Sequence, residues 1–148
     1  MQTLSNRLRE VPGTATLLGW LGLLPFLALP LLIAGMPEYR ALCQTLLADY
    51  AFGILCFLLG IWWGIGVMRG EPRPLLLSNL LFLVLLAART LLQNAPFMVI
   101  AATLFIAIIV LEHSLAVFQR QPAYYARMRI QLSLVAAVSL LTVAFVLY

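Results

Sequence analysis

The chain has 148 residues, of which 64% are hydrophobic and 9% are charged, and its formal net charge is +4. Soluble domains carry roughly 25% charged residues. This composition therefore excludes a water-soluble globular protein and predicts one whose main solvent is the lipid bilayer. The positive charge comes entirely from arginines near the ends of apolar runs rather than in one patch, so we expect no nucleic-acid partner.

Five long apolar runs, separated by short polar stretches, follow one another along the chain. Each is long enough to cross a hydrocarbon core of about 30 Å. We therefore predict an all-α fold, a polytopic integral membrane bundle of five transmembrane helices that forms a single domain, 1–148. The predicted spans cover residues 12–34, 45–68, 75–93, 97–118 and 127–148.

The first span contains Pro25 and Pro30. Each proline lacks a backbone N–H and disturbs a regular helix, which membranes tolerate where neighbouring helices satisfy the freed carbonyls. We expect both prolines to bend this span and to mark positions of helix packing.

The second span carries small residues at helical spacing, Gly53, Cys56, Gly60 and Gly64, with Asp49 four residues before the first of them. Small residues on one helix face let another helix approach closely. We predict that this stripe, Asp49 included, faces protein rather than lipid.

The third span places Arg89 near its outer end, with Asn79 and Gln93 on a neighbouring face. Asp49 lies at a similar depth in the adjacent, antiparallel second span. Because an isolated charge inside the membrane costs about 2.5–3.5 kcal/mol or more, we predict an Asp49–Arg89 ion pair. Its role is open between a structural clamp, an arginine that reaches the interface, and a substrate or proton site.

The fourth span contains Glu112 and His113, at a depth comparable to that of Trp62, Trp63 and Asn79. A glutamate there needs a hydrogen-bond partner, and an indole N–H or the Asn79 amide can serve. A Glu–His pair can also relay protons, although adjacent residues on a helix point in different directions. A structural role and proton or ligand handling both remain open.

The arginines also predict the orientation of the bundle. The N-terminus, the 69–74 loop and the 119–129 loop lie on one predicted side and hold seven of the nine arginines. Cytoplasmic loops carry an excess of basic residues, so we predict an N-in, C-out topology.

No cofactor or metal site is predicted. One histidine and two separated cysteines do not give a metal-ligand spacing, and no nucleophile elbow, P-loop or dinucleotide-binding glycine pattern is present. We name no catalytic residue.

Three segments carry a family resemblance: residues 18–26, LGWLGLLPF; residues 50–64, YAFGILCFLLGIWWG; and residues 122–129, PAYYARMR. Together they resemble the family called domain of unknown function 3429, which occurs in proteobacteria and mitochondria. The resemblance implies a multi-pass protein of the bacterial inner membrane and no known catalytic residue. In one departure, Trp62 stands where the family commonly has a basic residue, which puts any activity that depends on that residue in doubt.

We expect a non-enzymatic accessory or assembly subunit of a membrane complex, in contact with the lipid bilayer and with a membrane-protein partner or other copies of itself. The short loops leave no extramembrane domain to hold a substrate. One alternative is an oligomeric small-solute or proton-coupled transporter that uses Asp49 with Arg89 and Glu112 with His113. A weaker alternative is a membrane enzyme that acts on lipid or quinone.

Overall fold

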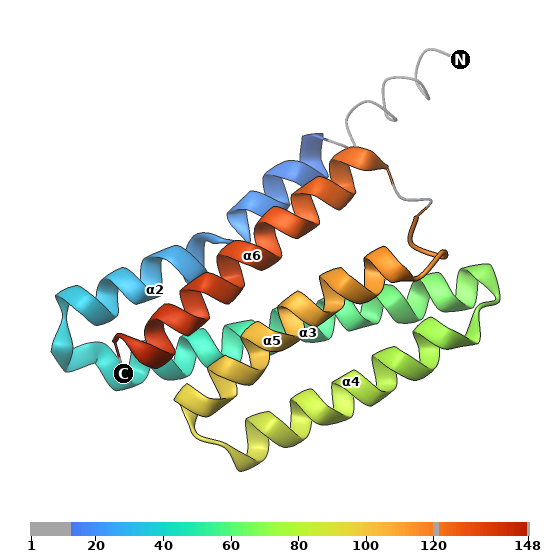
Figure 1. Cartoon of the computed structure of the whole chain (residues 1–148). Helices are drawn as coiled ribbons and strands as arrows, with labels where there is room; N and C mark the ends of the chain where they lie inside the picture. Colours follow the sequence, from blue (N-terminus) through green and yellow to red (C-terminus); the bar gives the residue numbers. More distant parts are fainter. Residues whose placement is uncertain (1–12, 120–121, 148) are drawn as a thin grey trace.

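The computed structural model describes residues 13–119 and 122–147, and within them every regular element is a helix (Figure 1). Five stretches are long and apolar enough to cross a membrane, which confirms the predicted number of spans. The elements are a helical stretch at 13–21, α2 (Leu24–Gly35), the 3₁₀ turn η1 (Pro37–Tyr39), α3 (Arg40–Arg69), α4 (Pro72–Leu91), α5 (Asn94–Ser114) and α6 (Ala123–Phe145).

The first membrane segment contains a break at Gly22–Leu23, where a turn separates the stretch 13–21 from α2. Pro25 lies in the first turn of α2, and Pro30 lies inside a helix that continues to Gly35. The break therefore comes before Pro25, because a proline is tolerated in a first turn, where its missing N–H is not needed.

Neighbouring helices satisfy the carbonyls beside these irregular positions, as expected. The Tyr50 hydroxyl of α3 donates to the Gly22 carbonyl at the break (2.9 Å). Pro30 lacks the N–H that would bond the Phe26 carbonyl one turn earlier, and the Ser139 hydroxyl of α6 donates to that carbonyl instead (2.5 Å). Two side chains thus fix α2 against α3 and α6.

Several helix boundaries differ from those of the predicted spans by three to five residues. The four later helices begin at 40, 72, 94 and 123, where the sequence predicted 45, 75, 97 and 127, and α5 ends at 114 rather than 118. Prolines explain the starts of α4, α5 and α6: Pro72 and Pro74, Pro96, and Pro122 lie in or just before first turns. The sequence reading assigned these prolines to loops, but a first turn accommodates them.

The helices pack in a bundle with α3 and α5 in the middle (Figure 1). α2 packs against α3 and α6, α5 packs against α6, and α4 packs against α3 and α5 at the opposite side. Large side chains fill the interior, among them Trp62, Phe26, Phe97 and Phe105. Many leucines, by contrast, are exposed on the outside, as expected of a surface that contacts acyl chains.

Candidate intramembrane sites

Glu112 accepts hydrogen bonds from two other helices near one end of the bundle. Its Oε1 accepts a hydrogen bond from the indole Nε1 of Trp62 on α3 at 2.6 Å and another from Nη2 of Arg129 on α6 at 2.5 Å. The Glu112 side chain is 12% exposed and the Arg129 side chain 6%. A carboxylate and a guanidinium thus neutralise each other in a buried position. The sequence-based prediction of an indole partner for Glu112 is confirmed.

Arg129 has a second neighbour on its own helix, Tyr125, one turn earlier. Its Nη1 donates to the Tyr125 hydroxyl at 3.5 Å, and its guanidinium carbon lies 5.8 Å from the centre of the tyrosine ring. Its Nε is buried and has no hydrogen-bond partner among the described residues. A buried donor without a partner costs about 1–3 kcal/mol.

Arg129 is the member of this cluster that the sequence did not lead us to predict, because it lies next to the loop arginines. The buried side of α6 gives the signal that could have placed it: Arg129, Ser133, Ala136 and Leu140 recur at helical spacing. A small-residue face that continues through an arginine indicates that the arginine points into the bundle.

Three residues predicted for this cluster lie outside it. His113 and Trp63 are exposed, and the Asn79 amide donates to the Leu75 carbonyl of its own helix rather than to Glu112. Glu112 and His113 therefore do not form one site, as expected of adjacent helix positions. Adjacent positions on a helix point about 100° apart, and Glu112 takes the inward one.

The predicted Asp49–Arg89 ion pair is confirmed at the opposite end. Nε and Nη2 of Arg89 both donate to Oδ1 of Asp49, at 2.8 and 2.5 Å, and Arg89 also lies over the Phe97 ring, 5.4 Å from its centre. This pair is less buried than Glu112 with Arg129, since the Asp49 side chain is 56% exposed. Gln93 is exposed at the start of α5 and makes no capping hydrogen bond.

The three glycines of this α3 stripe face away from the other described helices, contrary to the prediction, whereas Asp49 contacts Arg89 of α4. A Cβ added at Gly53, Gly60 or Gly64 would meet no atom within 4 Å. The alternative side of α3, with Ala48, Ala51 and Leu55, is the buried one. We call Asp49, Gly53, Gly60 and Gly64 the open face of α3.

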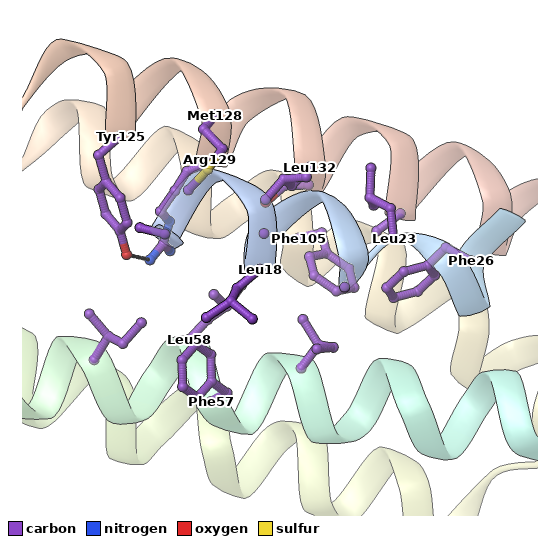
Figure 2. Close-up of a pocket in the computed structure, with 17 residues that line it drawn as sticks. Leu18, Leu23, Phe26, Phe57, Leu58, Phe105, Tyr125, Met128, Arg129 and Leu132 are labelled. Carbon is purple, nitrogen blue, oxygen red and sulfur yellow. Dashed lines mark hydrogen bonds between the residues drawn. The ribbon is translucent and has the colours of Figure 1, made fainter. Parts of the chain in front are cut away.

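A pocket of about 360 Å³ lies between the 13–21 stretch, α2, α3 and α6 (Figure 2). Its walls are leucines, phenylalanines and small residues, and Arg129 lines it together with Tyr125. In Figure 2, Tyr125 and Arg129 lie at one end of the pocket and Phe26 at the other. No group of three or more residues able to hold a metal ion is found in 13–119 and 122–147.

Comparisons with known proteins indicate a membrane protein. A family described as "Protein of unknown function (DUF3429)" matches residues 11–145. Transmembrane protein 69 of Xenopus tropicalis is 31% identical over 137 residues, which make up 90% of this chain and 54% of that protein. The chain thus spans about half the length of this relative. No solved structure matches.

Proposed function

Since the chain belongs to the DUF3429 family, whose function is unknown, we propose that it is a non-enzymatic accessory or assembly subunit of a larger membrane complex. The connections from α2 to α5 are a few residues long. The surface on which it can bind a partner is therefore mostly the surface of its helices.

The open face of α3 is the observation that carries this proposal. Gly53 and Gly60 have free space above them, and the half-exposed Asp49 carboxylate lies on the same side of the helix. Charged groups in a membrane span usually face protein rather than lipid, and a glycine surface lets a second helix come close enough for van der Waals packing. A helix from a membrane-protein partner would fill the space and cover the ion pair.

A transporter is supported less well than a subunit. Asp49 and Trp62 are thirteen residues apart on one helix, so the two charged clusters lie about 20 Å apart along its axis. Apolar side chains fill the bundle interior between them, including Leu55, Leu59 and Phe105. His113, which a proton relay would use, is exposed away from Glu112.

The proposal includes the membrane and the orientation: the bacterial inner membrane, with the N-terminus in the cytoplasm and the C-terminus outside. Arg69, Arg73 and Arg127 lie around one end of the bundle, where α3 ends and α6 begins. We call this the arginine-rich end and place it at the cytoplasmic surface, because basic residues are retained on that side.

The test is purification of the tagged full chain in mild detergent from its native membrane, with Gly60→Leu as the decisive variant. Nothing lies within 4 Å of a Cβ at Gly60, so leucine there leaves the fold intact but blocks close approach of a partner. We expect a partner of fixed stoichiometry with the wild type and its loss with Gly60→Leu. Ala87→Leu enlarges an exposed position on α4 in the same way and should keep the partner.

Mass measurement of the purified species separates the alternatives. A homo-oligomer without any other chain would contradict the subunit proposal and favour transport. A partner that Gly60→Leu and Ala87→Leu both retain would show that the complex forms elsewhere on the molecule and would contradict the role of the open face of α3.

A further inference from the structure

We propose that the pocket beside Arg129 binds a quinone, an uncharged molecule that dissolves in the membrane and carries a carbonyl oxygen on a flat ring. This binding does not depend on a partner at the open face of α3. The pocket has a volume of about 360 Å³, which falls in the range of small-ligand pockets, about 300–1,000 Å³. It opens among side chains that face lipid, such as Leu18 and Phe57. A molecule dissolved in the membrane can therefore enter it from the side.

Arg129 supplies a buried polar contact to the pocket, beside Tyr125 and Ser133, which carry hydroxyl groups. Its side chain is 6% exposed, it lines the pocket, and its Nε–H is the described buried side-chain donor that has no partner. Buried donors are nearly always satisfied in native proteins. The ligand atom that suits this position is a hydrogen-bond acceptor.

The charges around Arg129 favour an uncharged acceptor over an anion. Nη2 of Arg129 already pairs with the Glu112 carboxylate, so the guanidinium has no uncompensated charge. An anion in the pocket would be brought close to Glu112 and would be repelled by it. A carbonyl oxygen accepts the Nε–H without this penalty.

Wall composition favours a quinone over the ester carbonyl of a lipid. Phenylalanine and tyrosine rings line the pocket at both ends and along the α3 wall: Phe26, Phe57, Phe105 and Tyr125. Aromatic rings prefer to pack against other flat rings in offset or edge-on arrangements.

The test is a titration of the detergent-solubilised full chain, labelled with a nitrogen isotope at arginine and followed by NMR. The Nε–H resonance of Arg129 is assigned by its loss in Arg129→Lys or, if that variant fails to fold, by its cross-peaks to the Tyr125 ring. A decyl-substituted para-benzoquinone should shift this resonance in a saturable way. Decylbenzene, which lacks the carbonyls, should bind about 10-fold more weakly, since a hydrogen bond to a charged group is lost.

Phe57→Ala tests the location without touching the charged cluster. Phe57 is 67% exposed and lines the pocket, so its loss should leave the fold intact and weaken quinone binding about 3- to 10-fold. Phe145→Ala removes a similarly exposed ring that does not line the pocket and should change nothing.

Two further probes identify the occupant if it is not a quinone. Methyl decanoate that binds as tightly as the quinone would overturn the quinone in favour of a lipid ester. Decanoate that binds more tightly than either would overturn the uncharged ligand. The absence of a saturable shift with any probe, or equal quinone affinity in wild type and Phe57→Ala, would overturn the site itself.

Discussion

Glu112 meets an indole from one helix and a guanidinium from another, and each donor has a separate effect. Arg129 compensates the charge of the carboxylate, and Trp62, which is fully buried, fixes the position of the same oxygen. The indole adds no charge to this cluster, so Arg129 is the cation that pairs with Glu112.

We expect Glu112→Gln and Arg129→Met each to lower the free energy of unfolding by about 3–5 kcal/mol, because each leaves the other buried charge without its partner. The double variant removes both charges and should recover much of the loss. Equilibrium unfolding of the four proteins in mixed micelles measures the coupling. Additive losses would contradict a direct ion pair.

The more exposed Asp49–Arg89 pair shows how far the cost of losing an ion pair depends on its burial. Asp49→Asn removes the charge from a carboxylate that is 56% exposed, and exposed pairs contribute about 0–1 kcal/mol. Its effect on the isolated chain should be well below that of Glu112→Gln. A loss as large as that of Glu112→Gln would show that burial is not what separates the two pairs.

At the scale of the helices, Gly70 ends α3 in a left-handed conformation, with φ of +65°. The Glu71 N–H then bonds the Gly66 carbonyl at 3.0 Å, and the Gly70 N–H bonds that of Val67 at 3.3 Å. These two bonds satisfy carbonyls at the end of the helix and turn the chain into α4. The tight turn positions the start of α4 against the end of α3.

We expect Gly70→Ala to destabilise the protein by about 1–2 kcal/mol, because a Cβ disfavours the left-handed conformation. Gly35→Ala is the matched control at the end of α2: a Cβ there meets nothing within 4 Å, and Gly35 does not have a positive φ. It should be neutral or slightly stabilising. The same unfolding measurement distinguishes the two, and equal effects would contradict the conformational explanation.

Hydropathy predicted the number of helices and their order, since each span needs a long apolar run. It could not predict which side of α3 faces protein, because almost every side chain of a membrane helix is apolar or small. Gly53 and Gly60 therefore resembled a packing face although Ala48, Ala51 and Leu55 provide it. The Asp49–Arg89 pair was predictable because charges are rare in the spans and these two share a depth. The inward position of Arg129 was not predictable in this way. It depended on whether α6 begins before or after this residue, and the sequence left that start uncertain.

At the scale of the whole molecule, polar contacts hold the two ends of the bundle. At the arginine-rich end, Glu112 joins α5 to α3 and α6, and Arg69 donates to the Val117 carbonyl beyond α5. At the other end, the ion pair joins α3 to α4, and the Asn94 amide donates to Thr45 at 3.0 Å. α3 takes part in contacts at both ends and is the central support of the bundle.

The orientation of this bundle is the last prediction. Five spans place the two termini on opposite sides of the membrane, and the arginine-rich end should face the cytoplasm. Arg129 lies inside α6 and pairs with Glu112, and Arg89 is paired with Asp49 at the opposite end. Even without these two, the predicted loops at the arginine-rich end keep most of the arginines.

A reporter active only outside the cytoplasm should therefore be active when fused after Tyr148 and inactive when inserted at Glu71, in the turn between α3 and α4. The reporter should again be active when inserted at Gln93, in the turn between α4 and α5. This third site tests whether reporter activity alternates from one span to the next. Activity at Glu71 with none at Gln93 and Tyr148 would reverse the orientation. Equal activity at Glu71 and Gln93 would contradict α4 as a membrane span.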